Sequence, residues 1–482
     1  MSEKYEIIVG LEIHAQLKTN SKIFAGDSTS FGKKPNTNVS VITLAHPGTL
    51  PKTNKKVVEL AIKMGIATNC RINQKTLFAR KNYFYPDLPK GFQTTQDKNP
   101  ICENGFLTIE LKNKTTKNIR IQRIHLEEDA GKSLHLDNEK DTLIDFNRAG
   151  VPLIEIVSHP DLRSGEEASV YMQEIRKIVK YLDICDGNME EGSLRCDANV
   201  SVRLKGENHL NTRTEIKNLN SFRFLQKAIE YEAKRQIELI ENNKQNEIIQ
   251  ETRGFDAVKE QTFSMREKEN LNDYRYFPEP DLAPLLISDE WLKSIQENLP
   301  ELPQKLLQRL IQQYQLSEYD AQRLVENKEI VLFFEETSRL LNDYKSIVNW
   351  ILETIKPFWI TIGIENNTCP INSKNLIDLI LLVSENKINN SAAQKIFSFI
   401  VKNPSKTPLE IAKEENLLIE NNENELETQI QVILEAFPDK VKEYQNGKKG
   451  LLSMFMGELM KKNKGKLNVK AANELLIEKL KK

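Results

Sequence analysis

The fold depends on two stretches of sequence, Gly10-Leu-Glu-Ile-His-Ala-Gln16 and Met189-Glu-Glu-Gly-Ser-Leu-Arg-Cys-Asp-Ala-Asn199. In the first stretch, apolar residues alternate with Glu12 and His14, and in the second they alternate with Arg195 and Asp197. Successive side chains of a β-strand point to opposite faces. The pattern therefore predicts two strands, each with one apolar face and one face of acids, a histidine and arginines. Such a set can hold a divalent metal and phosphates.

The composition is that of a globular chain with no strong overall charge. Its 482 residues are enough for two to four domains. The 68 Lys and Arg residues nearly balance the 69 Asp and Glu residues, which leaves a formal net charge of −1. Any surface that binds nucleic acid must therefore be local.

The cysteine spacing, and the lack of a signal-peptide pattern and of a membrane-spanning pattern, indicate a cytoplasmic protein. The cysteines are scattered and unpaired in spacing, which argues against a disulfide framework or a zinc knuckle; they are Cys70, Cys102, Cys185, Cys196 and Cys369. The N-terminal residues lack the pattern of a signal peptide. Apolar runs such as 376–383 are too short to span a bilayer, so we expect no membrane partner.

The character of the sequence changes near residue 295. Before this point short strand patterns dominate, without regular crossover helices, so we predict the α+β class with an antiparallel sheet. The predicted strands are Glu6–Leu17, Gly105–Leu111, Ile119–Leu126, Leu153–Val157, Cys196–Leu204 and Thr212–Lys217, and the predicted helices are Lys55–Ala67, Ser164–Tyr181 and Ser221–Ile240. After it, apolar residues follow helical spacing. We predict a catalytic domain over 1–294, a helical domain over 295–409 and a helical tail over 410–482.

Further acids fall on the predicted strands. Glu127, Glu128 and Asp129 follow one strand directly, and Glu215 lies within another. A single acid of this kind is more often an ordinary surface residue, but four predicted strands carry acids in the same way. Adjacent carboxylates in a cleft require a cation, and oxygen ligands with one histidine suit Mg²⁺ better than zinc.

No glycine-rich loop for phosphate is present. Gly131-Lys132-Ser133 resembles the end of a Walker loop, but Leu126 occupies the position of the required earlier glycine. Bound ATP would therefore depend on Mg²⁺ and basic side chains. Arg80 and Lys81 lie in a basic, aromatic segment, Ala79–Gln93, which is a candidate; packing of its aromatic residues on the core is the alternative.

Taken together, these motifs resemble a known family, the B subunits of the bacterial aspartyl/glutamyl-tRNA(Asn/Gln) amidotransferases. The resemblance runs from about residue 5 to the C-terminus and preserves motif order. The segments that carry it are Gly10–Leu17, Arg80–Gln93, His125–Lys132, Asp145–Asp161, Met189–Arg203, Glu215–Phe222, Glu251–Arg253, Ser264–Arg266 and Asp273–Asp281. It implies a catalytic domain like glutamine synthetase, then a helical domain and a small helical tail.

The resemblance implies a reaction and its site. ATP would phosphorylate the Glu or Asp side chain carried on mischarged tRNA, and ammonia would then displace phosphate to give Gln-tRNA(Gln) or Asn-tRNA(Asn). The implied catalytic residues around Mg²⁺ and ATP are Glu12, His14, Glu127, Glu128, Asp197 and Glu215, and the expected metal ligands are Glu12, His14, Glu128, Asp197 and Glu215. From their face and charge, we expect Arg195 and Arg203, with Arg80 and Lys81, to bind the phosphates.

The resemblance also implies partners and one missing metal. No amidase signature is visible, so ammonia would come from a separate glutaminase (the A subunit), joined by a small C subunit. The sequence leaves open whether Glu-tRNA(Gln), Asp-tRNA(Asn) or both are substrates. Many family members bind zinc through four cysteines, but the matching positions here are Ala25, Asp27, Ser40 and Thr43. We therefore expect no zinc, and a loop over Phe24–Pro47 held by packing alone.

The C-terminal tail is basic. Residues 441–482 contain eleven lysines against four glutamates, and the lysines that we expect to bind tRNA are Lys448, Lys449, Lys461, Lys462, Lys464 and Lys466. They alternate with a helical apolar stripe. The resemblance favours a module that contacts tRNA phosphates and shape, with a purely solubilising tail as the alternative.

Two other functions stay open at the level of sequence. A free amino-acid amide ligase would share the acidic face but would not need a basic tail. A non-catalytic tRNA-binding assembly protein would keep the tail but has no reason to retain so many clustered acids.

Overall fold

The computed structural model describes residues 4–135, 140–267, 274–364, 368–419, 423–462 and 469–481. The chain forms two compact units, Met1–Pro303 and Gln304–Lys482. Among the described residues, no helix combines the length and the apolar character needed to cross a membrane.

A nine-stranded sheet forms the centre of the first unit. In spatial order its strands are β14 (Gln261–Glu267), β13 (Glu251–Asp256), β12 (Thr214–Leu219), β11 (Leu194–Leu204), β1 (Tyr5–Gln16), β10 (Pro152–Ser158), β7 (Thr116–Glu128), β6 (Cys102–Glu110) and β2 (Arg71–Ile72). Neighbouring strands are antiparallel except β12 and β13, which are parallel. The predicted α+β class is confirmed.

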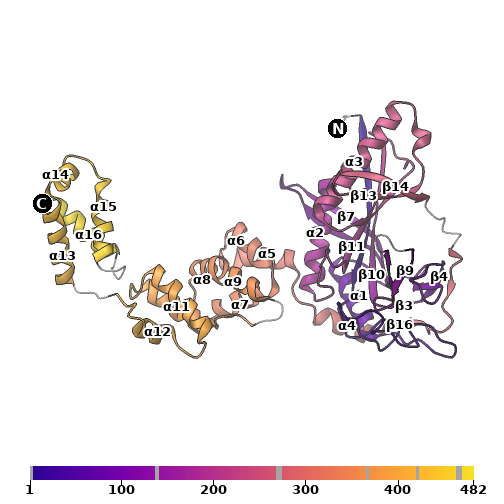
Figure 1. Cartoon of the computed structure of the whole chain (residues 1–482), viewed down its shortest axis with the longest axis horizontal. Helices are drawn as coiled ribbons and strands as arrows, with labels where there is room; N and C mark the ends of the chain where they lie inside the picture. The colour runs from indigo at the N-terminus through magenta and orange to yellow at the C-terminus, as the bar shows by residue number, and fades with distance from the viewer. Residues whose placement is uncertain are drawn as a thin grey trace. The chain divides into compact units, whose positions relative to one another are not determined.

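Helices cover one face of this sheet because that face is apolar. Leu11 and Ile13 of β1 are buried. The helices α2 (Gly165–Tyr181) and α3 (Phe222–Glu241) contact β1, and α1 (Lys55–Ala67) contacts β6 and β7 of the same sheet (Figure 1). Ser164 and Ser221 cap α2 and α3 by accepting backbone N–H groups. Such a cap is worth about 1 kcal/mol. The opposite face of the sheet is left for the polar side chains.

The predicted elements are present with small shifts at their ends. The helix over Lys55–Ala67 has the predicted bounds, and the six predicted strands correspond to β1, β6, β7, β10, β11 and β12. Strands β13 and β14 were missed. Their inward side chains include the buried, charged Glu251 and Arg253, so they lack the apolar alternation that signals a strand.

Smaller elements surround the sheet. The three-stranded sheet β15-β4-β5, with the pairs β16-β3 and β8-β9, lies outside the main sheet. Their bounds are β3 (Lys75–Thr76), β4 (Ala79–Asn82), β5 (Phe92–Thr95), β8 (Lys132–His135), β9 (Thr142–Asp145), β15 (Phe277–Pro278) and β16 (Leu285–Leu286), with η1 at Gln245–Glu247 and α4 at Asp289–Glu297. Because α4 packs against α1, the first unit extends beyond the boundary predicted at residue 295.

The second unit is helical in its described residues. Its elements are α5 (Pro303–Tyr314), α6 (Glu318–Val325), α7 (Lys328–Ser338), α8 (Tyr344–Trp350), the π-helical turn η3 (Ile351–Ile355), α9 (Lys356–Ile362), α10 (Ser373–Ser384), α11 (Asn390–Lys402), α12 (Pro408–Glu414), α13 (Glu423–Ala436), α14 (Pro438–Gln445), α15 (Leu451–Lys462) and α16 (Val469–Lys481). Helices α13 to α16 share a core that includes Ile430, Phe455 and Leu476. The boundary predicted at 410 falls within α12, which packs on α10 and α11.

A buried carboxylate ties α3 to the sheet. Glu232 of α3 is fully buried and accepts hydrogen bonds from Thr214 of β12 and Thr262 of β14, both at 2.9 Å. It also pairs with Arg235 at 2.7 Å and with Arg253 of β13 at 3.3 Å. One side chain therefore fixes three strands against one helix.

We expect Glu232→Ala to lower the free energy of unfolding by about 3 kcal/mol, because the buried hydroxyls of Thr214 and Thr262 lose their acceptor. Arg253 loses one of its two carboxylate partners and keeps Glu251. Urea unfolding followed by circular dichroism measures the change. Glu238→Ala is the matched control. Glu238 lies on the same helix, is 61% exposed and forms an exposed ion pair of 3.7 Å with Lys234. Its loss should therefore change the free energy of unfolding by less than about 1 kcal/mol. Equal losses in the two variants would contradict this account.

Candidate active site

The polar face of the sheet brings together side chains from five adjacent strands. In the register of β1 and β11, Glu12 lies opposite Asp197 and His14 lies opposite Arg195. On the other side of β1, His14 lies opposite Glu155 of β10. Because facing residues of antiparallel strands lie about 5 Å apart, this register places residues from remote parts of the chain in one site.

One set of side chains, the histidine group, consists of His14, Glu127 and Glu155, whose ligand atoms lie within 4.8 Å of one another. His14 Nε2 is 3.5 Å from Glu127 Oε1 and 3.6 Å from Glu155 Oε2. His125 of β7 joins them, with its Nε2 3.1 Å from Glu155 Oε2. The donor types and distances fit one divalent cation.

The histidines balance the charge of the two glutamates. Burial alone lowers the pKa of His14, but a hydrogen bond and the charge of Glu155, together with the charges of Glu127 and Asp197, outweigh it and raise the pKa to about 9. The pKa of Glu155 is correspondingly well below its usual range, because the positive charge of His125 and the contacts with His14 outweigh the cost of burial. A metal ion that binds His14 at neutral pH must therefore displace a proton.

A second set, the carboxylate group, consists of Glu12, Asp197 and Glu215. Asn199 donates to Glu12 at 2.9 Å. Lys217 Nζ lies 2.8 Å from Asp197 Oδ2 and 3.3 Å from Glu215 Oε1. Burial would lower the pKa of Lys217, but the charges of Asp197 and Glu215 outweigh it and raise this pKa.

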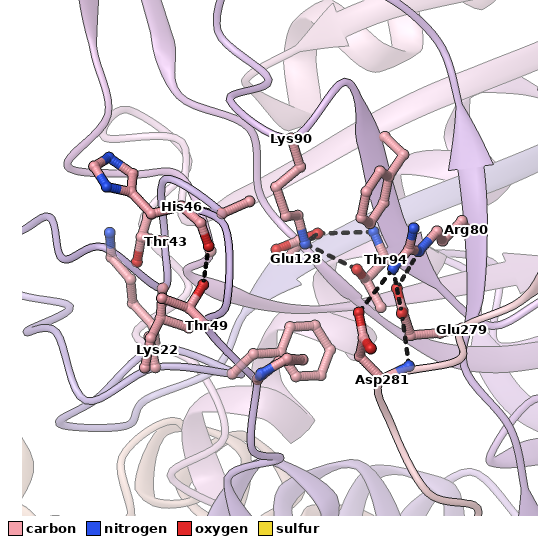
Figure 2. Close-up of a pocket in the computed structure, with 17 residues that line it drawn as sticks. Lys22, Thr43, His46, Thr49, Arg80, Lys90, Thr94, Glu128, Glu279 and Asp281 are labelled. Carbon is pink, nitrogen blue, oxygen red and sulfur yellow. Dashed lines mark hydrogen bonds and ion pairs between the residues drawn. The ribbon is translucent and has the colours of Figure 1, made fainter.

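Glu128 lies apart from both groups. It follows Glu127 on β7, so its side chain points to the opposite face. There it pairs with Lys90 and accepts a hydrogen bond from the backbone N–H of Thr94 at 2.7 Å. Figure 2 shows these residues in the wall of a cavity of about 340 Å³, where Arg80 also lies. Among the described residues, Glu128 belongs to neither group. The other four expected metal ligands are divided: His14 lies in the histidine group, and the carboxylate group contains Glu12, Asp197 and Glu215.

The four predicted phosphate-binding side chains already have partners, and they are dispersed. Arg80 makes two hydrogen bonds of 2.8 Å to Glu279 and one of 3.0 Å to Asp281 (Figure 2). Lys81 Nζ lies 4.6 Å from the centre of the Tyr274 ring.

The two arginines of β11 lie at opposite ends of the strand. Arg195 is 3.2 Å from Asp129, beside the polar face. Arg203 lies opposite Glu6 and donates to it at 2.8 Å. Glu6 and Glu12 are six positions apart on β1, about 20 Å along a strand, so Arg203 lies far from the carboxylate group.

Two residues of the site, Glu155 and His125, were not predicted as site residues from the sequence. Glu155 alternates with Ile154 and Ile156, a signal equivalent to the one that identified Glu12. His125 precedes Glu127 by two residues on the same face of β7. The alternation was visible, but only the pairing of β7, β10 and β1 shows that these side chains meet His14.

The loop over Phe24–Pro47 is held by hydrogen bonds, so the expectation of packing alone was wrong. Asp27 accepts a hydrogen bond from Ser40 Oγ at 2.9 Å and another from Thr43 Oγ1. The side chains at three of the four positions, Asp27, Ser40 and Thr43, are therefore joined directly by hydrogen bonds. Ala25, at the fourth position, offers no ligand atom.

Some of the tail lysines that we expect to bind tRNA are exposed. Lys448 and Lys461 are more than 70% exposed, and each pairs with a nearby glutamate, Glu443 or Glu458. Lys449 Nζ lies 4.3 Å from the centre of the Tyr444 ring. Lys462 ends α15, whereas Lys464 and Lys466 lie outside the described residues.

Comparison with known proteins identifies the family of the chain. Residues 7–293 match the model of the GatB/GatE catalytic domain, and residues 332–480 match the model of the GatB domain. The chain is 48% identical over 478 residues to the B subunit of aspartyl/glutamyl-tRNA(Asn/Gln) amidotransferase from Thermodesulfovibrio yellowstonii, covering 99% of this chain and 100% of that protein. It is 47% identical to the protein of the same name from Pseudomonas aeruginosa, covering 99% of each chain. The catalytic-domain match and the full-length identity show that the chain belongs to the B-subunit family of the aspartyl/glutamyl-tRNA(Asn/Gln) amidotransferases.

Proposed function

We propose that the polar face of β12, β11, β1, β10 and β7 activates the side-chain carboxylate of Glu or Asp carried on mischarged tRNA. As a member of its family, the chain is one component of a ligase that forms a carbon–nitrogen bond on aminoacyl-tRNA. The observation that carries the proposal is the convergence of the histidine group and the carboxylate group on one face. The outcome of the reaction is Gln-tRNA(Gln) or Asn-tRNA(Asn).

The chemistry explains why such a site is needed. A carboxylate does not react with ammonia at neutral pH, because its oxygen is a poor leaving group. Transfer of the γ-phosphoryl group of ATP to this oxygen forms an acyl phosphate and releases ADP; ammonia then attacks the carbonyl carbon and phosphate leaves. Positioning and charge neutralisation are the main demands of phosphoryl transfer.

We propose that His14, Glu127 and Glu155 hold Mg²⁺, since their atoms form a compact donor set. The ion would neutralise phosphate charge during transfer. Glu12, Asp197 and Glu215 face the same space and, with Lys217, orient the charges around it. This arrangement, with acids on one face of an antiparallel sheet and helices on the other, supports a catalytic domain of the glutamine synthetase type.

The state of the buried cysteines bears on which partners supply ammonia. Membership of a B-subunit family implies a complex whose substrate is tRNA-bound. Glutamine hydrolysis needs an activated nucleophile, whereas burial raises the pKa of Cys102, Cys185 and Cys196 and disfavours their thiolates. We therefore assign ammonia supply to a glutaminase, the A subunit, joined by a small C subunit. The five free cysteines support a cytoplasmic location.

We expect Glu155→Gln to lower ATP-dependent activation by at least about a hundredfold, because the histidine group loses a charged ligand. The measurement is ADP release that depends on mischarged Glu-tRNA(Gln), in the reconstituted complex with ammonium as nitrogen donor. Glu12→Ala and Asp197→Ala should show comparable losses. Glu110→Gln, at an exposed end of β6, is the control and should retain full activity.

Two outcomes would contradict this proposal. Near-normal ADP release by Glu155→Gln would remove the histidine group from the reaction. ADP release that is equally fast with free glutamate would instead indicate a free amino-acid amide ligase.

We propose that the loop over Phe24–Pro47 works without zinc, since Ala25, Asp27, Ser40 and Thr43 supply no thiolate. We expect Asp27→Ala to cost about 1–3 kcal/mol, because the Ser40 and Thr43 hydroxyls lose their acceptor. Asp27→Asn, which keeps an acceptor oxygen, should cost less. Thermal unfolding with and without a strong chelator measures both effects, and stoichiometric bound zinc would contradict the proposal.

We propose that the tail binds tRNA phosphates through Lys448, Lys449, Lys461 and Lys462, with Lys464 and Lys466 in the same set. Changing the first four to alanine should raise the KM for mischarged tRNA and leave kcat unchanged. The slope of log affinity against log salt should decrease by up to about 3, at roughly 0.7–0.9 per phosphate contact. The matched Lys→Arg variant should bind normally, and equal tRNA binding by both variants would identify a solubilising tail.

A further inference from the structure

The polar face of the sheet continues beyond the carboxylate group onto the two end strands, β13 and β14. Glu215 of β12 lies beside Thr252 of β13, and these two strands are parallel. Lys217 and Gly254 each lie two residues further along, so they are neighbours on the same face. Lys217 Nζ in turn lies 2.8 Å from Asp197 Oδ2 of β11. One row of residues therefore leads across the sheet from Gly254 to the carboxylate group.

The side chain of Phe263 continues this row onto β14. Phe263 lies opposite Gly254 in the register of β13 and β14. A β-carbon built on Gly254 would lie 2.5 Å from Cζ of Phe263 and 2.9 Å from each of its Cε atoms. Phe263 is nevertheless 50% exposed. Its ring is therefore packed on the backbone of a glycine at its far end and still open to solvent.

An exposed glutamine lies next to this ring. Thr262 of β14 points to the opposite face, where its hydroxyl donates a hydrogen bond to Glu232 of α3 at 2.9 Å. Gln261 and Phe263 flank Thr262, so their side chains point away from α3 and toward the polar face. Both residues are exposed. An aromatic ring beside one well-placed polar group is typical of sites for small molecules.

The ring lies at a suitable distance from the carboxylate group. Glu12, Asp197 and Glu215 lie on β1, β11 and β12, with β11 in the centre. Gly254, beneath the ring, lies two strands from β11, which is about 10 Å. An extended nucleoside triphosphate spans a distance of this order between its base and its γ-phosphate.

We propose that Phe263 and Gln261 bind the adenine base of ATP, with the triphosphate directed across β12 toward β11. The inference rests on the function proposed above, because it takes ATP as the phosphoryl donor. An aromatic ring gives a base a stacking surface. A glutamine amide can accept a hydrogen bond from the N6 amino group of adenine and donate one to N7. Guanine has an oxygen in place of that amino group, so Gln261 discriminates against GTP.

The charge along the row favours ATP over the terminal adenosine of tRNA, which carries the same base. The path from the ring to Asp197 passes the ammonium group of Lys217. In ATP, negative phosphates connect the adenosine to the reacting phosphorus, and they suit a path beside an ammonium group. In aminoacyl-tRNA, the link from the adenosine to the side-chain carboxylate contains no phosphate and bears an α-amino group.

Equilibrium dialysis of ATP against the reconstituted complex, at fixed Mg²⁺ and without tRNA, tests the site directly. We expect Phe263→Ala to raise the Kd for ATP about tenfold, because the base loses its stacking surface. Phe263→Tyr keeps an aromatic ring and should bind ATP normally. Phe106→Ala is the matched control, since Phe106 is 39% exposed and lies on β6, near the other edge of the same sheet.

Gly254→Val provides a second variant that keeps Phe263. Its added side chain needs the space that the ring occupies, so the ring is displaced and the Kd for ATP should rise as in Phe263→Ala. This variant keeps the proposal testable if Phe263→Ala does not fold or does not join the complex.

Nucleotide preference tests the role of Gln261. A glutamate at this position can still accept a hydrogen bond but cannot donate one to N7 of adenine. We expect Gln261→Glu to lower the ratio of kcat/KM for ATP to kcat/KM for GTP by about tenfold or more. Release of ADP or GDP in the presence of mischarged tRNA and ammonium measures this ratio.

Two results would overturn the proposal. One is an unchanged Kd for ATP in both Phe263→Ala and Gly254→Val. The other is a raised KM for mischarged tRNA with an unchanged Kd for ATP, which would assign the ring to the terminal adenosine of tRNA.

The base site and the proposed function fail in different ways. Undiminished ADP release by Glu155→Gln, with weakened ATP binding by Phe263→Ala, would refute the role of the histidine group and leave the base site intact. Normal ATP binding by Phe263→Ala and Gly254→Val, with ADP release abolished in Glu155→Gln, would refute the base site and leave the function intact.

Discussion

The antiparallel pairing of β1 with β11 is the constraint on which the site depends. This single register places Glu12 opposite Asp197 and His14 opposite Arg195. A shift of one residue would turn every polar side chain of one strand toward the helices. The apolar residues between them prevent such a shift, because Leu11 and Ile13 are buried and cannot be exchanged for charged neighbours without large cost.

The same amphipathic sheet separates stability from chemistry. Its helix-covered face carries the aliphatic core, while its open face collects carboxylates that repel one another. The structure accommodates this repulsion by interleaving cations: histidines between Glu127 and Glu155, Lys217 between Asp197 and Glu215, and arginines around Asp129. A site balanced in this way is preorganised, because the acids hold their positions before any substrate arrives.

Two parts of the chain outside the sheet are held by contacts of their own. In the loop over Phe24–Pro47, the carboxylate of Asp27 accepts hydrogen bonds from the hydroxyls of Ser40 and Thr43 and so joins two backbone segments. The tail forms its own core from α13 to α16. Among the described residues of the tail, Lys448 and Lys461 therefore lie on a folded surface.

The sequence by itself determined the α+β class, the six strands around the site and the polar faces of β1 and β11, because period-two alternation is a local property. It did not reveal β13 and β14, because the buried side chains of β13 include the charged Glu251 and Arg253. Nor did it reveal that Glu127 and Glu128, although adjacent in sequence, lie in different surroundings. Only the tertiary structure decided that Glu155 meets His14, that Lys217 lies among carboxylates and that Arg203 lies far away. The reason is physical: alternation fixes the face of each side chain, whereas strand order and register fix its neighbours, and these depend on contacts between residues more than a hundred positions apart.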